Sequence, residues 1–182
     1  MHKKTIRRII KEKLSSLSKI EKLEKDKIIF SKLTGHAAYV KCNKLFIFVS
    51  FGNEVDTHRI IMDALSKGKT VAVPVILSLE EGMVAVEIHS LEELKENKYG
   101  ILEPLLIKNR IVSPSEIDLA IIPGAAFDKN GGRLGYGAGM YDKYLVNLKS
   151  DVKKIALGYY FQVIEEVPME VHDIRMDEII TD

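Results

Sequence analysis

The chain has 182 residues, of which 46% are hydrophobic and 29% charged, and its formal net charge is +1. This is ordinary globular composition, and at roughly 100–200 residues per domain we expect a single domain over residues 1–182. The one cysteine, Cys42, excludes an intrachain disulfide and a CxxC metal site. No apolar stretch approaches the ~20 residues of a membrane helix, and none follows the basic start of the chain. We therefore expect a cytoplasmic protein without a signal peptide or a membrane segment.

The first 27 residues are strongly basic. They hold ten Lys or Arg and four Asp or Glu, a net +6, so the remainder carries −5. Apolar residues at helical spacing predict an amphipathic helix over residues 3–14 and, after a capping box of Ser18 and Glu21, a second helix over about 19–33. A basic arm on a slightly acidic body suggests a partner that carries phosphate groups. A solvated helix face is the alternative, and the charge pattern leaves both open.

The next segment predicts a β-α-β unit. Residues 45–49 (LFIFV) form a continuous apolar run, typical of a strand that is buried on both faces of a parallel sheet. Residues 56–66 have the period of a helix, which Gly68 ends, and residues 70–73 are strand-like until Pro74 closes them. The connection is long enough to join parallel strands.

The rest of the chain continues this alternation. Further strands are predicted at residues 83–88, 118–122, 154–160 and, at an edge, 178–181, with helices after Ser90 and over about 140–148. This order predicts the α/β class, as a three-layer sandwich with a mainly parallel, Rossmann-like sheet flanked by helices.

The segment from Pro123 to Tyr144, PGAAFDKNGGRLGYGAGMYDKY, holds six of the twelve glycines. It follows a buried strand and leads into a helix, which is where open α/β sheets bind ligands. Glycines let backbone N–H groups approach an anion closely, and Arg133 adds a fork of donors that suits phosphate. Neither GxxxxGK[ST] nor GxGxxG occurs in it. We interpret it as a phosphate-binding loop, and a mobile surface loop with turn glycines is the alternative.

The same segment resembles PGxAFDxxGxRLGxGxGxYD, the signature of the 5-formyltetrahydrofolate cyclo-ligases, also called methenyltetrahydrofolate synthetases. The match is long and gapless. Its members are Pro123, Gly124, Ala126, Phe127, Asp128, Gly131, Arg133, Leu134, Gly135, Gly137, Gly139, Tyr141 and Asp142. Shorter matches lie along the whole chain, at residues 3–7, 54–57, 99–104 and 167–181. Met140 departs from the pattern, because many members carry an aromatic residue there.

The resemblance implies a reaction that needs ATP as co-substrate and Mg²⁺. Members convert 5-formyltetrahydrofolate to 5,10-methenyltetrahydrofolate and release ADP and phosphate. ATP phosphorylates the formyl oxygen, N10 attacks the activated carbon, and phosphate leaves. The enzyme would thus be an ATP-dependent cyclo-ligase that forms a carbon–nitrogen bond. Phosphoryl transfer needs positioning and charge neutralisation more than covalent help, which gives the basic arm a role.

The resemblance also implies the residues of the site. The candidate catalytic residues are Lys3, Arg7 and Arg133. The candidate ATP-binding residues are Lys3, Lys4, Arg7, Arg133, Leu134, Gly135, Tyr136, Gly137, Ala138, Gly139, Met140 and Tyr141. The candidate folate-binding residues are Val49, Phe51, Glu54 and Tyr99, and the candidate Mg²⁺ ligands are Asp142 and Asp177.

Each of these roles has a structural alternative. Asp142 has the position of an acid that interacts with a helix dipole, and Glu54 precedes a predicted helix in the same way. Val49 and Phe51 fit a hydrophobic core equally well, and Tyr99 fits a plain surface tyrosine. The residues alone do not decide between these interpretations.

Two other functions remain open on sequence grounds. One is a nucleotide- or nucleic-acid-binding module without catalysis, which the basic first helix favours. The acidic remainder and the lack of a known nucleic-acid motif oppose it, so we expect no nucleic-acid partner. The other is an ATP-using ligase for a different one-carbon or pterin-like substrate. We expect 5-formyltetrahydrofolate as substrate, no membrane partner, and a monomer.

Overall fold

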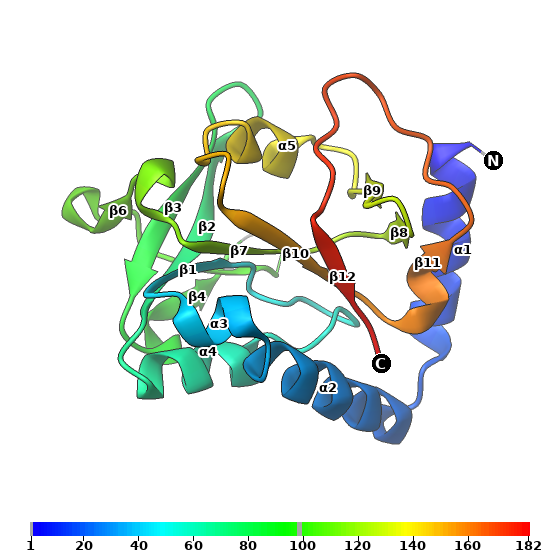
Figure 1. Ribbon diagram of the computed structural model, residues 1–182, viewed down its shortest axis with the longest axis horizontal. Coiled ribbons are helices and arrows are strands. Elements are labelled where there is room, and N and C mark those ends of the chain that lie inside the picture. The colour runs from blue at the N-terminus through cyan, green and yellow to red at the C-terminus, as the bar shows by residue number, and fades with distance from the viewer. Residues whose placement is uncertain (1, 98–99) are drawn as a thin grey trace.

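The computed structural model describes residues 2–97 and 100–182. A seven-stranded sheet lies at its centre (Figure 1). In spatial order its strands are β12 (Glu178–Ile180), β10 (Lys153–Leu157), β7 (Leu119–Ile122), β1 (Lys44–Ile47), β2 (Thr70–Ser78), β3 (Gly82–Ile88) and β6 (Ile111–Val112). The strands from β12 to β2 are all parallel, whereas β3 runs antiparallel to both β2 and β6. The expected mainly parallel sheet is confirmed.

The position of β1 between two cores explains why its sequence is apolar throughout. Successive side chains of a strand point to opposite faces of the sheet. Leu45 and Ile47 enter the core on one face, and Phe46 enters a second core on the other face. All three side chains are fully buried. A strand with a core on each side cannot alternate polar and apolar residues, so the apolar run predicted the layered arrangement correctly.

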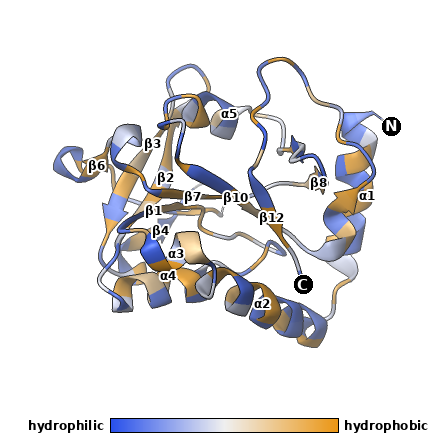
Figure 2. Cartoon of the chain, viewed as in Figure 1, coloured by the Kyte–Doolittle hydropathy of each residue, from blue (hydrophilic) through white to orange (hydrophobic). Residues whose placement is uncertain are grey.

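Among the residues that the structure describes, five α-helices lie around the sheet. They are α1 (Lys3–Ser16), α2 (Lys19–Thr34), α3 (Ala37–Lys41), α4 (His58–Ser66) and α5 (Met140–Leu145). Residues of α1, α2 and α4 contribute to the core around Leu45, whereas α5 packs into the core around Phe46. Figure 2 shows hydrophobic and hydrophilic residues interspersed along the helices. The predicted three-layer α/β sandwich is therefore confirmed.

Part of the glycine-rich segment is not a loop. Within it lie β8 (Ala126–Asp128) and β9 (Arg133–Leu134), which form a small sheet with β11 (Val163–Ile164). The carboxylate of Asp128 accepts hydrogen bonds from the backbone N–H groups of Asn130, Gly132 and Val167. Burial by itself raises the pKa of Asp128, but these three donors outweigh it, so its pKa lies below the usual value. Asp128 thus holds the turn in place as an anion.

The strand boundary at Pro74 was predicted wrongly. Strand β2 continues through Pro74 to Ser78 and pairs with β3, with Pro74 opposite Ala85. Pairing between β2 and β1 stops at Ala72, so no neighbouring strand needs the N–H that proline lacks. Other boundaries moved less: α4 begins at His58, α5 ends at Leu145, and β10 ends at Leu157.

Shorter elements lie between the main ones, among them the 3₁₀ turns η2 (Lys108–Arg110), η3 (Pro114–Glu116) and η4 (Tyr160–Gln162). Strands β4 (Leu94–Glu96) and β5 (Leu102–Pro104) form a hairpin, and the helix expected after Ser90 is a single 3₁₀ turn, η1 (Leu91–Glu93). None of the helices in the described residues is long and apolar enough to cross a membrane.

The C-terminal segment returns across the glycine-rich segment. The N–H of Met176 donates to the carbonyl oxygen of Gly131 at 2.8 Å, and the guanidinium of Arg175 donates to the carbonyl of Asn130 at 2.9 Å. Gly131 has a φ of +80°, and a Cβ at this position would lie 2.2 Å from the carbonyl oxygen of Met176. Glycine is therefore required both by the backbone conformation and by the closeness of the tail.

We predict that Gly131→Ala lowers the free energy of unfolding by about 3 kcal/mol or more, because it adds a backbone clash to an unfavourable φ. The matched control is Gly68→Ala. Gly68 also has a positive φ, +73°, but a Cβ added there would meet no atom of a described residue within 4 Å beyond its chain neighbours. Its cost should be about 1 kcal/mol. Denaturant unfolding of both variants provides the measurement, and equal losses would contradict the packing argument.

Candidate functional site

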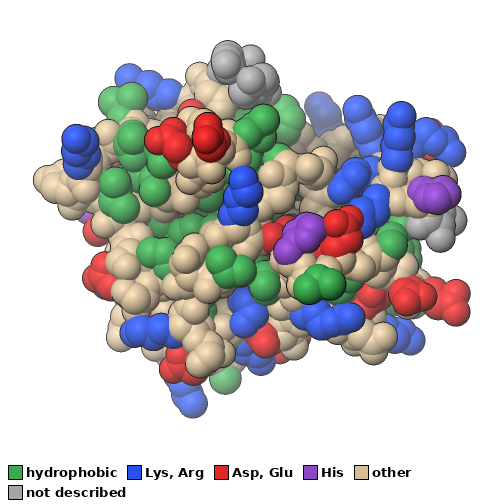
Figure 3. Space-filling view, turned by 90° about the horizontal axis from the view of Figure 1, so that it is seen from above, with side chains coloured by type: hydrophobic (Ala, Val, Ile, Leu, Met, Phe, Trp, Pro, Cys, Tyr) green, Lys and Arg blue, Asp and Glu red, His purple; other side chains and the backbone are tan. Residues whose placement is uncertain are grey.

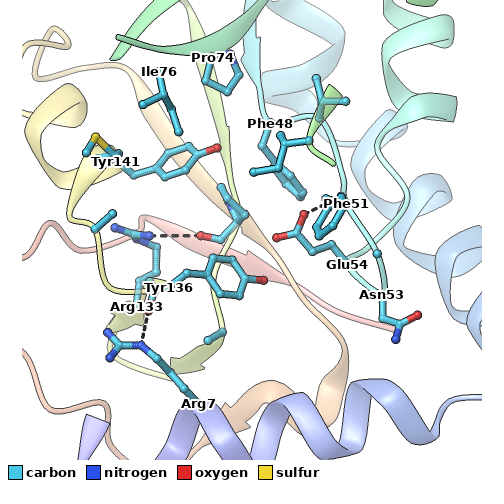
Figure 4. Close-up of a pocket in the computed structure, with 18 of the residues that line it drawn as sticks. Arg7, Phe48, Phe51, Asn53, Glu54, Pro74, Ile76, Arg133, Tyr136 and Tyr141 are labelled. Atoms are coloured by element: carbon cyan, nitrogen blue, oxygen red, sulfur yellow. Dashed lines mark hydrogen bonds between the residues drawn. The ribbon is translucent and has the colours of Figure 1, made fainter. Parts of the chain in front are cut away.

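A cavity of about 620 Å³ opens beyond the carboxyl ends of β1 and β7. Its walls come from α1, the segment that follows β1, the side formed by β2, β3 and β5, and the glycine-rich segment. Figure 4 shows side chains from these parts converging on one space. This is the edge at which open α/β sheets bind ligands.

Arg133 lies at the floor of the glycine-rich side. Its side chain is only 2% exposed, and its Nη2 donates to Asp142 Oδ2 at 2.7 Å. Nη1 donates to the carbonyl of Pro123, and the guanidinium lies 5.8 Å from the centre of the Tyr141 ring. Within the described residues, the buried Nε of Arg133 has no hydrogen-bond partner. Buried donors are nearly always paired, so this atom favours a ligand with an acceptor oxygen.

Arg7 reaches the same loop from α1. Its Nε donates to the carbonyl oxygen of Gly135 at 2.8 Å (Figure 4). Gly137 has a φ of +117°, and a Cβ there would lie 3.7 Å from the guanidinium carbon of Arg7. The backbone N–H groups of residues 136–139 donate no hydrogen bond to any described residue. The loop therefore presents two guanidinium groups and several available amide donors, which suits an anion such as phosphate.

The opposite wall carries an acid. Glu54 lies in the segment after β1, and its Oε2 accepts from the N–H of Phe51 at 2.9 Å. Burial raises the pKa of Glu54, against the opposing effects of that N–H, the Tyr136 hydroxyl and the charge of Lys22. Tyr136 and Tyr141 point from the loop toward this wall (Figure 4). A partly desolvated carboxyl group here can accept hydrogen bonds from the N–H groups of a heterocyclic ring.

Asp142 joins the loop to the C-terminal segment. Besides its ion pair with Arg133, its Oδ1 accepts from the N–H of Ile174 at 3.1 Å. It lines the cavity as expected. Asp177 does not: it pairs with Lys154 Nζ at 2.9 Å and accepts from the backbone N–H of the same residue. The structure therefore places Asp142 at the cavity but gives no support to Asp177 as its partner.

The basic arm is only partly in the cavity. Lys3 does not line it and instead pairs with Glu170 at 2.8 Å and with Asp173 at 3.2 Å, while Lys4 is exposed. Figure 3 shows Lys and Arg side chains gathered on the side of the molecule where α1 lies. The sequence analysis did not single out Lys11, which lines the cavity one helical turn beyond Arg7. Its spacing of four residues from Arg7 was a usable signal.

The remaining candidates divide between cavity and core. Val49 and Phe51 line the cavity, as do Gly135, Tyr136 and Ala138 through Tyr141. Leu134 is buried in β9 with 2% exposure and lies outside the lining. Tyr99 lies outside the described residues. The apolar wall of Phe48, Pro74, Ile76 and Met83 was missed, because core and cavity residues carry the same apolar pattern.

The described residues contain no group of three His, Cys, Asp or Glu side chains that could hold a metal ion by itself. Asp142 supplies oxygen ligands of the kind that Mg²⁺ prefers. Mg²⁺ usually takes one or two carboxylates, with phosphate oxygens and water completing its shell. The site thus fits a magnesium ion that arrives together with a phosphate ligand.

Comparison with known proteins decides the family. The model of the 5-formyltetrahydrofolate cyclo-ligase family matches residues 1–182. The chain belongs to this family. Its relatives include the 5-formyltetrahydrofolate cyclo-ligase of Mus musculus, 32% identical over 98% of this chain and 92% of that protein. The cyclo-ligase of Escherichia coli strain K12 is 28% identical over 95% of this chain and 96% of that protein.

Solved structures agree with this placement in the cyclo-ligase family. The NMR structure of Aquifex aeolicus 5,10-methenyltetrahydrofolate synthetase matches with a TM-score of 0.85 and 29% identity, over 99% of this chain and 89% of that one. The 5,10-methenyltetrahydrofolate synthetase from Mycoplasma pneumoniae matches with a TM-score of 0.81 and 26% identity, over 100% and 99%. The resemblance seen in the sequence and the expected enzyme class, a cyclo-ligase, are confirmed.

We predict that Glu54→Gln stabilises the cyclo-ligase at alkaline pH. Because burial raises the pKa of Glu54 in the folded state, the unfolded chain loses this proton first as pH rises, and wild-type stability falls. The neutral amide avoids that loss. The gain should be near zero at pH 4 and reach about 1 kcal/mol at pH 8.

Urea unfolding at both pH values measures this difference. Glu92→Gln, at an exposed position, is the matched control and should change stability little at either pH. A Glu54→Gln variant that is less stable than wild type at pH 8 would show that the carboxylate is stabilised, not penalised, by its surroundings.

Proposed function

We propose that the chain converts 5-formyltetrahydrofolate to 5,10-methenyltetrahydrofolate and couples this to conversion of ATP to ADP and phosphate. The observation that carries the proposal is the pairing of two unlike walls in one cavity. A loop with two guanidinium groups and available N–H donors faces a partly desolvated acid. The names of the relatives supply the folate substrate.

The ATP phosphates would lie along the glycine-rich loop. Arg7 and Arg133 would neutralise their charge, and the N–H groups of residues 136–139 would bind their oxygens. The orphaned Nε of Arg133 would gain its missing acceptor. Lys3 and Lys4 remain candidates, with Lys3 moving from Glu170 and Asp173 to a phosphate when ATP binds.

The pterin ring would lie against the opposite wall. Glu54 would accept hydrogen bonds from the amino and ring N–H groups, and Val49 and Phe51 would cover the ring faces and edge. Tyr99 stays a candidate for stacking on the folate. The apolar side formed by Pro74, Ile76 and Met83 would exclude water from the reacting formyl group.

The chemistry would then follow in two steps. The formyl oxygen attacks the γ-phosphorus of ATP, and ADP leaves. N10 donates its electron pair to the formyl carbon, the carbon–oxygen bond breaks, and phosphate carries the former formyl oxygen away. Loss of the N10 proton leaves the N5–CH–N10 methenyl cation. Arg133 and Arg7 would stabilise the charge that builds up on the transferred group.

Mg²⁺ is proposed as the metal, held by the carboxylate of Asp142 together with phosphate oxygens. The ion would neutralise phosphate charge. Asp142 would then share its oxygens between the ion and Arg133, while Ile174 N–H fixes its orientation. Asp177 enters such a site only if the C-terminal segment rearranges, since it pairs with Lys154 here.

We also propose that residues 1–182 act as one domain, as a cytoplasmic monomer. A nucleic-acid-binding module is the less favoured alternative, because two cations of the basic arm already bond to other parts of the chain. Lys3 pairs with two acids of the tail, and Arg7 bonds to the loop.

The reaction is tested by the absorbance of the methenyl product, with and without ATP and Mg²⁺. Arg133→Ala should lower kcat/KM by at least about 100-fold, because it removes a buried cation from the phosphate site. Circular dichroism must show that the variant is folded. Product formation without ATP, or a folded Arg133→Ala enzyme with wild-type activity, would contradict the proposal. ATP hydrolysis without product would point to another folate or pterin.

Variants of two neighbouring arginines of α1 distinguish a specific contact with ATP from a general effect of positive charge. Arg7 bonds to the loop, whereas Arg8 pairs with Glu12 on the exposed side of the helix. Arg7→Ala should raise the KM for ATP about 10-fold or more, because it removes both a phosphate partner and the support of Gly135. Arg8→Ala should leave it within about 2-fold. Steady-state kinetics would refute the assignment if both variants behaved alike.

A further inference from the structure

Asp26 of α2 is a buried acid that does not line the cavity. Its side chain is 6% exposed. Its Oδ1 accepts from the hydroxyl of Tyr159 at 2.8 Å and from the backbone N–H of Asp56 at 3.2 Å, and its Oδ2 accepts from Lys22 Nζ at 2.7 Å. A buried carboxylate is costly unless it is paired and hydrogen-bonded. Three donors from three different parts of the chain bond to the carboxylate of Asp26.

Tyr159 connects Asp26 to the segment that carries Glu54. The tyrosine follows β10 and is fully buried. Its hydroxyl lies 2.8 Å from Asp26 Oδ1 and 3.4 Å from the backbone carbonyl oxygen of Glu54. Burial, together with the charge and hydrogen bond of Asp26, raises the pKa of Tyr159, so the hydroxyl stays a donor. The ring thus stands between a fixed carboxylate and the backbone of the proposed pterin-binding acid.

The backbone of Tyr159 is fixed to the other wall of the cavity. Its N–H donates to Gln162 Oε1 at 2.8 Å. The side-chain amide of Gln162 donates to the carbonyls of Gly124 and Ala125, at 3.0 and 3.1 Å. Gly124 and Ala125 lie near the start of the glycine-rich segment. A single buried network therefore links the Glu54 wall to the wall proposed for ATP.

The segment from Ser50 to Thr57, which contains Glu54, has supports at both ends. The hydroxyls of Ser50 and Thr57 each accept the backbone N–H of the other residue, at 3.1 and 2.8 Å. These two hydrogen bonds join the ends of the segment to each other but do not attach it to another element. Val55 packs into the core, and Asp26 and Tyr159 supply polar contacts from outside the segment, to the N–H of Asp56 and the carbonyl of Glu54.

We propose that Asp26 and Tyr159 are positioning residues that set the place of Glu54 relative to the glycine-rich loop, and so determine the affinity for the pterin ring. The inference rests on the proposed function, because it concerns the same site. Neither side chain touches the cavity, so both act through Glu54. A displacement of this acid weakens ring binding while the ATP loop stays in place.

Tyr159→Phe is the first test, and the chain offers a matched control. Tyr39 is also fully buried, and its hydroxyl also donates to an aspartate, Asp63, at 2.6 Å, but both Asp63 and the nearby carbonyl of Ile60 belong to α4 and not to the segment that carries Glu54. We expect Tyr159→Phe to raise the KM for 5-formyltetrahydrofolate about 3- to 10-fold, with the KM for ATP unchanged. Tyr39→Phe should lower the melting temperature comparably and leave both KM values unchanged.

A double-mutant cycle with Glu54→Gln tests whether the effect passes through Glu54. If it does, Tyr159→Phe should add little to the folate KM of Glu54→Gln. Lys22→Met provides a variant that keeps both buried side chains. Because it removes one partner of Asp26, it should raise the folate KM in the same direction, by a smaller factor.

The outcomes separate the two proposals. An active wild-type enzyme in which Tyr159→Phe and Tyr39→Phe have equal kinetics overturns the positioning role alone. Multiplicative effects of Tyr159→Phe and Glu54→Gln overturn it as well, since the two residues would then act independently. A wild-type chain that makes no methenyl product overturns the proposed function, and this inference falls with it.

Discussion

The ion pair between Arg133 and Asp142 is the interaction on which the site depends. Both side chains are largely withdrawn from water, with exposures of 2% and 14%. Removing one partner of a buried pair costs about 3–5 kcal/mol, because the other is left charged and unpaired. Asp142 also accepts the N–H of Ile174, so the pair fixes β9, α5 and the C-terminal segment against one another. The orphaned Nε of Arg133 shows that this charge is not fully satisfied by the described residues, and a phosphate oxygen would complete its set of partners.

The two walls of the cavity come from different parts of the chain and have opposite electrostatic character. The glycine-rich wall gathers cations and amide donors, and the wall after β1 carries a carboxyl group whose pKa is raised by burial. In the proposed reaction a phosphoryl group passes from ATP to the folate, so both must be bound at once with their reacting atoms held close. A buried network of hydrogen bonds through Asp26, Tyr159 and Gln162 links the two walls. Under the proposed function Glu54 binds the pterin ring, and the raised pKa is the energetic cost of placing a carboxyl group there.

The sequence was sufficient for local features and for the family, but not for contacts between distant segments. The apolar run of β1, the helical spacing in α1 and the Ser18 capping box predicted those elements correctly, because each depends on neighbouring residues. Pro74 led to a wrong prediction of where β2 ends. Its effect depends on whether a second strand needs the N–H that proline lacks. Asp177 was chosen by motif alone, whereas its actual partner, Lys154, is set by the pairing of β10 with β12. The role inferred for Asp26 had no sequence signal, because its partners lie up to 133 residues away.

Transfer of the formyl oxygen to phosphate is the most direct measure of the proposed mechanism. 5-Formyltetrahydrofolate labelled with ¹⁸O in its formyl group would be converted with unlabelled ATP, and the released phosphate analysed by mass spectrometry. If the loop held by Arg133 and Asp142 delivers the γ-phosphoryl group to the formyl oxygen, one ¹⁸O atom appears in each phosphate formed. Phosphate free of label, with the heavy oxygen recovered in water, would contradict the account, because ATP would then be cleaved without activating the formyl group.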